Sequence, residues 1–268
     1  MKWLLVANVA VFVVDLALAG KWGADYLTSE GVVRFPPIIG WGAFSVRSAV
    51  FEGRVWEFLT FQFLHGGLGH ILFNSVGLYF FGPWMERWWG SLRFLVFYLL
   101  CGIAGGVFYT ALVLAGFLPS GTMVGASAGI YGILIGVAVI APNLRAQLLF
   151  PPIELSMRQL AMLILAIAAG SVIFRIGGNE GGEAGHLGGA IMGFLLVKFP
   201  FLLGSGTALR YPRDPNYQAK LRPRTVVDLK ADDEVDAVLE KISRDGFQSL
   251  TEEDEKILKR AQERAERR

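Results

Sequence analysis

Long apolar runs separated by short polar segments make up most of the first 204 residues of the chain. A helix needs about 20 apolar residues to cross a bilayer, and a helix satisfies its own backbone polar groups there. The runs predict six membrane-spanning helices, at residues 3–20, 70–81 with an extension back toward residue 61, 92–117, 127–141, 157–175 and 184–203. The fourth is short, and the second is expected to end at an aromatic belt of Trp84, Trp88 and Trp89.

The first apolar run also resembles a secretory signal peptide. It lacks a convincing small-residue cleavage site, and further apolar runs follow it, so we expect a retained helix. Trp3 and Trp22 flank the run and are expected to act as interface anchors.

Composition divides the chain into two regions. Of all residues 53% are hydrophobic and the mean hydropathy is +0.47, which is typical of a membrane protein. Residues 205–268 nevertheless hold 14 of the 25 Lys and Arg and 14 of the 23 Asp and Glu. The sequence therefore predicts a membrane domain at 1–204 and a charged cytosolic tail at 205–268.

Within the tail, two segments have helical features, and they divide at Gly246. Apolar residues recur at helical spacing in the first segment, and Thr251 is a suitable N-cap for the second, which has acidic residues in its first turn. The pattern predicts a helical hairpin over 232–268. Its balanced charge fits a cytosolic protein contact or a solvated appendage better than lipid binding. The apolar positions of the first segment are Val235, Val238, Leu239 and Ile242.

Charge and residue counts exclude several functions. A net charge of +2 provides no basic surplus for nucleic acid. The single cysteine, Cys101, forms no intrachain disulfide and is expected to be a packing residue. The chain has three histidines, and His65 and His70 lie five apart, about 140° around a helix, which does not fit the usual zinc spacing. We therefore expect no metal.

The distribution of arginine predicts the orientation in the membrane. An even number of spans puts both termini on one side, together with the short connections that contain Arg87, Arg93, Arg145 and Arg158. The positive-inside rule makes that side cytoplasmic. The first loop, at 21–60, is also basic, but it is long; it either lies in the bilayer interface or forms a compact cap. We expect an integral protein of a bacterial cytoplasmic (inner) membrane.

Few polar residues lie within the predicted spans, and such residues are costly in lipid and therefore candidates for function. His70 and Asn74 lie four residues apart, about 40° around a helix, so they share a face, and Ser127 and Tyr131 share the same relation. The full set comprises Asp15, His70, Asn74, Ser75, Ser127, Tyr131 and His186, with His65 at the edge of the second span.

Glycine spacing predicts how the fourth and sixth spans pack. Both have small residues at intervals that allow close backbone approach, namely Gly125, Gly129, Gly132 and Gly136 in one and Gly185, Gly189 and Gly193 in the other. If these faces meet, Ser127 and His186 come to the same depth, each near the first turn of its helix. A serine hydroxyl becomes a good nucleophile when a base takes its proton, so the pair is a candidate dyad.

Attack on a carbonyl also needs hydrogen-bond donors for the developing oxyanion. The backbone N–H of Ser127 at a helix N-terminus offers one, and His70 and Asn74 offer others. Plainer roles stay open at this point, because a serine in a span often mediates helix packing, a histidine can bond a carbonyl, and an asparagine can bridge helices. The segment "GASAG" also lacks the preceding strand of a soluble hydrolase elbow.

Three motifs in order, "HGGLGHILFN" (65–74), "GASAGIYG" (125–132) and "GHLGG" (185–189), resemble the rhomboid family of intramembrane serine proteases. The resemblance covers residues 1 to about 205 and implies an all-α, polytopic, six-helix rhomboid-like bundle. It also implies cofactor-free cleavage of transmembrane protein substrates in the lipid bilayer, on the face opposite the cytoplasm.

By matching position, the resemblance implies a role for each polar residue. Ser127 would be the nucleophile and His186 its base, while His70, Asn74 and the Ser127 amide would form the oxyanion hole. Tyr131 would stack on His186 and orient it, and His65 would be structural.

Two acidic residues bear on the resemblance. The family uses a dyad without an acid, and Glu183, three residues before His186 but on the loop side, is expected to be solvated. Where the family often has Trp-Arg in the first loop, this chain has Trp56 followed by Glu57, with Arg54 before them. The sequence therefore does not determine which salt bridges form in this loop.

The leading hypothesis is therefore an intramembrane serine endopeptidase that cleaves helices containing unstable, small-residue segments. The alternative is a non-proteolytic rhomboid-like protein that binds membrane clients. An unrelated six-span transporter ranks last, because Asp15 is the only acidic residue well inside a span and inverted repeats are not evident.

Overall fold

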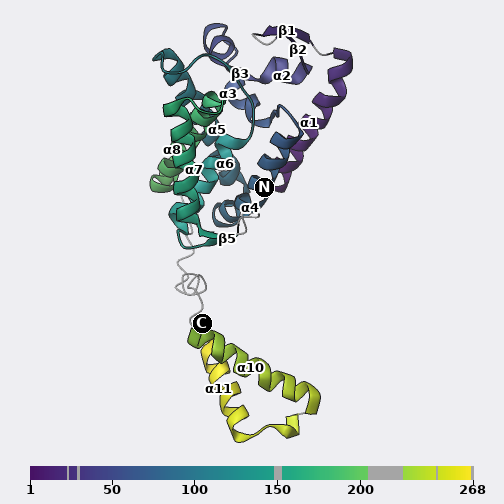
Figure 1. The fold of residues 1–268 in the computed structure, drawn as a ribbon, viewed down its shortest axis with the longest axis vertical. Coiled ribbons are helices and arrows are strands. Elements are labelled where there is room, and N and C mark those ends of the chain that lie inside the picture. Colours follow the sequence, from purple (N-terminus) through teal and green to yellow (C-terminus); the bar gives the residue numbers. More distant parts are fainter. Residues whose placement is uncertain (23, 29–30, 148–152, 205–225, 246, 267–268) are drawn as a thin grey trace. The chain divides into compact units, whose positions relative to one another are not determined.

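The computed structural model describes residues 1–22, 24–28, 31–147, 153–204, 226–245 and 247–266. The chain forms two compact units, Met1–Tyr211 and Pro212–Arg268 (Figure 1). The predicted boundary after residue 204 adjoins residues 205–225, which lie outside the described part of the chain.

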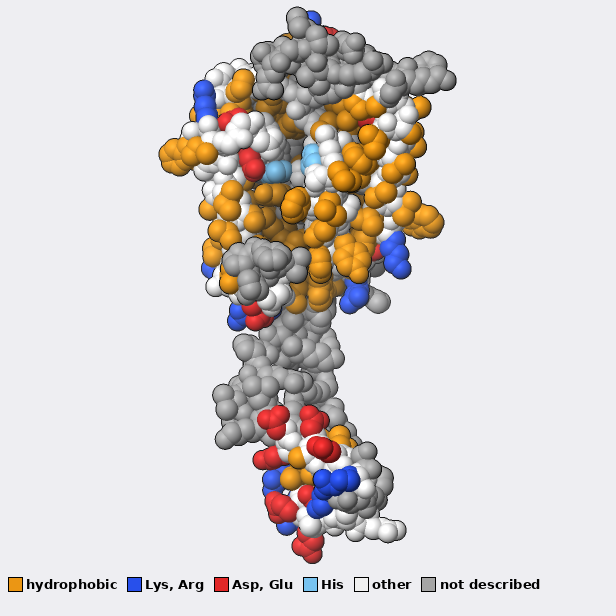
Figure 2. Space-filling view, turned by 45° about the vertical axis from the view of Figure 1, so that its right-hand side comes forward, with side chains coloured by type: hydrophobic (Ala, Val, Ile, Leu, Met, Phe, Trp, Pro, Cys, Tyr) orange, Lys and Arg blue, Asp and Glu red, His pale blue; other side chains and the backbone are white. Residues whose placement is uncertain are grey.

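Six long helices build the first unit: α1 (Lys2–Trp22), α4 (Leu68–Trp89), α5 (Ser91–Leu114), α6 (Ser127–Ile140), α7 (Met157–Phe174) and α8 (Glu180–Lys198). Three of them, α1, α5 and α7, are long and apolar enough to cross a membrane, and α6 is a shorter apolar helix. Hydrophobic side chains cover much of the face of this unit seen in Figure 2, with charged side chains toward its two ends. Such a surface suits a lipid environment.

Two helices, α4 and α8, differ from the prediction at both ends. Helix α4 continues through Pro83 and the aromatic belt, and it ends where Gly90 takes a φ of +78°. Its expected extension back toward residue 61 is instead a separate short 3-10 helix, η2 (Phe61–Phe63). Helix α8 begins four residues earlier than expected and ends at Lys198, before the 3-10 turn η3 (Pro200–Leu203).

Short strands are present that the all-α prediction omits. Hydrophobic periodicity does not reveal them, because each belongs to a two-stranded antiparallel pair of two to five residues a strand. The pairs are β1 (Ala24–Thr28) with β2 (Gly31–Phe35), β3 (Phe44–Ser45) with β4 (Thr122–Met123), and β5 (Arg145–Gln147) with β6 (Glu154–Ser156).

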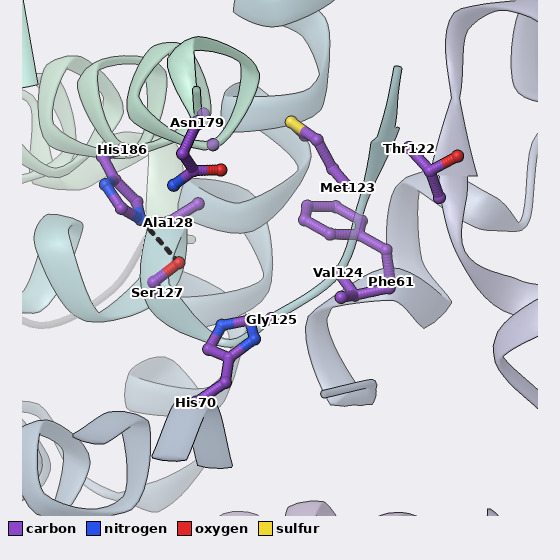
Figure 3. A pocket seen from close by; sticks show the side chains of 12 residues that line it. Phe61, His70, Thr122, Met123, Val124, Gly125, Ser127, Ala128, Asn179 and His186 are labelled. Carbon is purple, nitrogen blue, oxygen red and sulfur yellow. Dashed lines mark hydrogen bonds between the residues drawn. The ribbon is translucent and has the colours of Figure 1, made fainter. Parts of the chain in front are cut away.

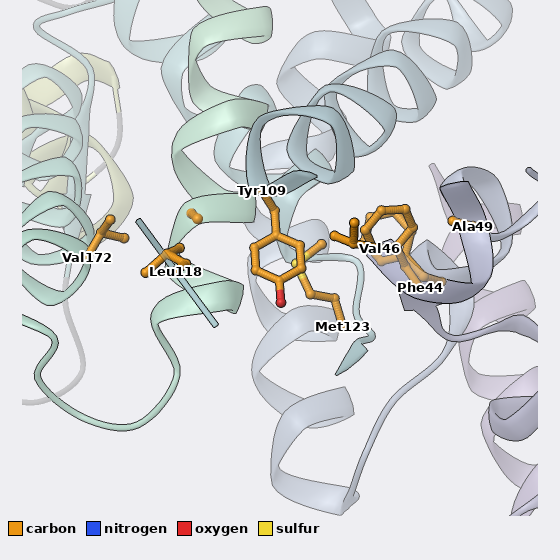
Figure 4. Close-up of a cluster of buried hydrophobic side chains, with 9 residues drawn as sticks. Phe44, Val46, Ala49, Tyr109, Leu118, Met123 and Val172 are labelled. Atoms are coloured by element: carbon orange, nitrogen blue, oxygen red, sulfur yellow. The ribbon is translucent and has the colours of Figure 1, made fainter. Parts of the chain in front are cut away.

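The first loop also contains the short helices α2 (Pro37–Gly42), η1 (Arg47–Phe51) and α3 (Glu57–Thr60). Its residue Phe44 is fully buried and meets Phe58 edge to face, with ring centroids 4.6 Å apart. A hydrophobic cluster joins the loop to α5, α7 and α8 (Figure 4), and it comprises Phe44, Val46, Ala49, Phe61, Tyr109, Leu118, Met123, Val172 and Ala184. Of the two interpretations left open for this loop, the packing supports the compact cap.

Asp15 of α1 also holds the first loop. Its carboxylate is buried and accepts a hydrogen bond from the backbone N–H of Ile38, at 2.9 Å, in the first turn of α2. The N–H groups of a first helical turn have no partner within the helix, so a carboxylate stabilises them. This acidic residue therefore has a structural partner in a neighbouring helix.

Glycine residues, which have no side chain, let α5, α6 and α8 approach closely. A Cβ on Gly189 would overlap the backbone carbonyl of Ala128, and a Cβ on Gly193 would lie 2.5 Å from the carbonyl oxygen of Gly132. The predicted contact between α6 and α8 is thus confirmed, but of the four glycines in the α6 motif only Gly132 faces α8. Gly105 of α5 is an unpredicted third participant, since its Cβ would lie 2.7 Å from the carbonyl oxygen of Gly185.

The second unit contains α10 (Val226–Asp245), the 3-10 turn η4 (Phe247–Ser249) and α11 (Glu252–Glu266). Thr251 precedes α11, and its hydroxyl accepts from the backbone N–H of Asp254, as an N-cap does. Lys241 of α10 donates to Asp254 at 2.7 Å and is the main cause that lowers the pKa of Asp254 to about 2. These contacts join the two helices as a hairpin.

Candidate active site

Ser127 and His186 lie close together in the first unit. Ser127 is the first residue of α6, and its Oγ lies 2.7 Å from Nε2 of His186 (Figure 3). His186 is in the second turn of α8 rather than near its start, because that helix begins at Glu180. The close glycine contacts between the two helices bring the hydroxyl and the imidazole within hydrogen-bond reach.

Tyr131 lies one turn after Ser127 on α6. Its ring stacks on the imidazole of His186, with centroids 4.1 Å apart and planes 11° from parallel. This contact restricts rotation of the imidazole and covers one of its faces. The predicted juxtaposition of these two rings is confirmed.

Contrary to the expectation from the sequence, Glu183 is not solvated. Its Oε2 lies 2.9 Å from Nδ1 of His186, and its side chain is 19% exposed. The expectation was wrong because it placed residue 183 in a loop, whereas three residues inside a helix bring two side chains onto one face. The three-residue spacing of Glu183 and His186 is the signal in the sequence that could have predicted this contact.

His70 and Asn74 of α4 face Gly125, just before α6. A Cβ on Gly125 would lie 2.6 Å from His70 Nε2 and 3.4 Å from Asn74 Nδ2. Gly125 also has a φ of +126°, which side-chain-bearing residues rarely adopt. The amide nitrogen of Asn74 is buried and has no hydrogen-bond partner among the described residues. An unpaired buried donor is costly, so such a group is a candidate for binding a ligand.

Ser127, His186 and His70 line a cavity of about 200 Å³. It has room for several water molecules, which a hydrolytic site requires. Sequence reasoning did not identify the cavity-lining residues Phe61, Met123 and Asn179, because they come from three separate segments of the chain. The complete lining comprises Phe61, His70, Thr122, Met123, Val124, Gly125, Ser127, Ala128, Asn179, Gly182, Gly185 and His186 (Figure 3).

His65 lies next to His70 of this site. It is buried, and its ring centroid is 5.1 Å from that of His70. Burial, and then the neighbouring His70, lower the pKa of His65 to about 4, so its imidazole is neutral near pH 7. Neither histidine belongs to a group of three metal-ligating side chains within the ranges that the structure describes.

Glu57, where the family often has arginine, is fully buried in the first loop. It pairs with Arg54 at 3.2 Å and accepts a hydrogen bond from the hydroxyl of Ser48. Arg54 in turn donates to the backbone carbonyl of Trp41. The loop therefore contains an acid–base pair whose arginine lies two residues before Trp56 rather than directly after it.

Comparison with known proteins identifies the family. A sequence model of the rhomboid domain matches residues 52–202, which is more than half of the chain. RHOMBOID-like protein 4 of Arabidopsis thaliana is 34% identical over 155 residues, covering 50% of this chain and 38% of that protein. Rhomboid protease GluP of Bacillus subtilis is 32% identical over 157 residues, covering 59% of this chain and 28% of that protein.

A third relative has a name that states the absence of activity. Inactive RHOMBOID-like protein 8 of Arabidopsis thaliana is 39% identical over 67 residues, covering 25% of this chain and 19% of its own length. The chain thus spans well under half the length of these three relatives. The domain match and the shared segments lead to one conclusion: the chain belongs to the rhomboid family.

Proposed function

We propose that this protein is an intramembrane serine endopeptidase that cleaves transmembrane segments of membrane proteins. The observation that supports this most strongly is the 2.7 Å contact between Ser127 Oγ and His186 Nε2 at the edge of a cavity of about 200 Å³. Ser127 is the proposed nucleophile and His186 its general base. Family membership supports the same reaction.

In the proposed first step, the Ser127 oxygen attacks the scissile carbonyl carbon while its proton passes to His186 Nε2. The same proton is then donated to the leaving amine as the peptide bond breaks, which leaves an acyl-enzyme for water to hydrolyse. Tyr131 holds the imidazole in position through both transfers. No cofactor is needed for this chemistry.

The carbonyl oxygen becomes negative during attack and needs donors that are already in place. The Ser127 backbone N–H, at the start of α6, and the side chains of His70 and Asn74, which both lie against Gly125, are the proposed donors. The unpaired Asn74 amide supports this role, because it has no other hydrogen bond to give up.

Replacing Asn74 with leucine tests the oxyanion hole. Asn74→Leu is expected to lower kcat about 100- to 1000-fold with little change in KM, since it removes a donor used mainly in the transition state. Thermal stability should change little, because the amide nitrogen has no partner to lose. Cleavage kinetics and thermal unfolding measure the two effects, with Ser75→Ala as the neighbouring control; unchanged kcat would remove Asn74 from the hole.

The proposed substrates are helices that unwind easily. Peptide bonds inside a helix are shielded, so local unwinding must precede attack, and small or polar residues make it less costly. We further propose six spans, both termini in the cytoplasm, and the site on the opposite face of a bacterial cytoplasmic membrane. The Pro212–Arg268 unit is then a cytosolic tail available for a protein contact.

Membrane proteomics tests the function directly. Cells that express the wild-type protein should release fragments of single-span proteins, and cells that express Ser127→Ala should not. If clients are retained equally by both proteins and neither cleaves them, the alternative of a non-proteolytic client-binding protein is correct.

A further inference from the structure

Glu183 and His186 form a pair on α8 that the Ser–His mechanism does not use. Both lie in the first two turns of the helix, three residues apart and therefore on one face. Glu183 Oε2 is 2.9 Å from His186 Nδ1, and the two side chains are 19% and 14% exposed. A contact this short between largely covered groups is a charge-assisted hydrogen bond.

The contact determines which imidazole nitrogen holds the proton. An ionised carboxylate only accepts hydrogen bonds, so His186 Nδ1 must donate. The neutral imidazole then has a free lone pair on Nε2, which is the atom 2.7 Å from Ser127 Oγ. This tautomer is the one that a general base needs, and the opposite tautomer would present a proton to the serine.

We propose that Glu183 is a positioning residue that orients His186 and stabilises its protonated form during attack, so that the site works as a serine–histidine–glutamate arrangement. This inference rests on the proposed protease function. The Nδ1 proton stays on the imidazole throughout, while the serine proton moves to Nε2 and then to the leaving amine. Glu183 itself gains no proton and touches no substrate atom.

Three other titratable groups lie near this pair, and none replaces the carboxylate. Tyr131 of α6 stacks on the imidazole face, and His70 of α4 lines the same cavity. Tyr109 of α5 packs against Gly181, and a Cβ on Gly181 would lie 3.1 Å from its ring. A phenol and an imidazole supply no negative charge beside Nδ1. Glu183 is thus the acidic group positioned to act on His186.

The test uses the pH dependence of reaction with a fluorescent fluorophosphonate, measured on the purified full chain. Glu183→Gln keeps the side-chain size but removes the charge, and Glu183→Ala removes the contact. We expect the plateau labelling rate to fall about tenfold for glutamine and up to about 100-fold for alanine. These losses are smaller than the roughly 10⁴-fold loss known for a fully buried triad acid, because Glu183 is partly exposed.

The acidic limb of the profile distinguishes positioning from general damage. If Glu183 acts on the group that takes the serine proton, its replacement should shift the acidic limb as well as lower the plateau. A misfolded variant would lose rate at every pH without such a shift. The matched control is Glu180→Gln, which removes the same charge one turn earlier on α8 and should leave both plateau and limb unchanged.

Nitrogen NMR of the three histidines supplies a readout independent of activity. His186 should show a protonated Nδ1 in the wild type, and this preference should weaken in Glu183→Ala. In one outcome, the wild-type protein is labelled in a Ser127-dependent way while the acidic limb, the plateau rate and the His186 tautomer are all the same in the Glu183 variants. In that case this inference fails and the protease proposal stands. If the wild type is not labelled at all, both fail.

Discussion

Ser127→Ala should lower the rate of substrate cleavage by about 10⁴-fold or more. The substitution removes the nucleophile, and in serine hydrolases the residual rate then comes from binding and the oxyanion hole alone. His186→Ala should have a similar effect, and the double variant should be no slower than either single one, because the two groups act as a unit. Cleavage of a single-span reporter in proteoliposomes measures all three.

Alanine fits the first position of α6, so Ser127→Ala should fold normally. Ser171→Ala, a serine replacement in α7, serves as the control and should cleave at the wild-type rate. Additive losses in the double variant would show that Ser127 and His186 act separately, which contradicts the proposed dyad.

Gly189→Ala should have the largest effect on stability. Its Cβ would overlap the carbonyl of Ala128, and a backbone atom cannot move without shifting α6 away from α8. Overpacking of this kind costs about 1–3 kcal/mol, and a backbone clash belongs at the upper end. Activity should also fall about 100-fold, since a displacement near 1 Å separates Ser127 from His186. Thermal unfolding and reporter cleavage measure the two effects.

Gly170 provides the matched control. It lies within α7, and a Cβ there meets no atom within 4 Å. Gly170→Ala should therefore leave activity unchanged and stabilise the helix by up to about 1 kcal/mol. If Gly189→Ala were as stable as the wild type, the close approach of α6 to α8 would not depend on the lack of a side chain at residue 189.

Helix positions and the central pair of residues could be predicted from the sequence because each depends on local patterns. Apolar runs locate the six long helices, and glycine spacing brings Ser127 and His186 together. The contact with Glu183 was missed for a local reason as well. The apolar run begins at residue 184, but α8 starts at Glu180, so a residue assigned to a loop lies on the helix.

Other features depend on contacts between distant segments. Strand β3 of the first loop is held by its pairing with β4 and by the cluster around Phe44, neither of which produces a periodic pattern. The role of Gly105 depends on where α5 crosses α6 and α8, which no motif specifies. The buried pair of Arg54 and Glu57 likewise follows from the fold of the loop rather than from residue spacing alone.

Mapping of a covalent inhibitor tests the central claim most directly. The purified chain would be treated with a fluorophosphonate, digested, and analysed by mass spectrometry to locate the modified residue. The account predicts one phosphonyl group, on the oxygen of Ser127, and its loss when His186 is replaced by alanine. Modification at a different serine, or undiminished labelling of Ser127→Ala, would contradict it.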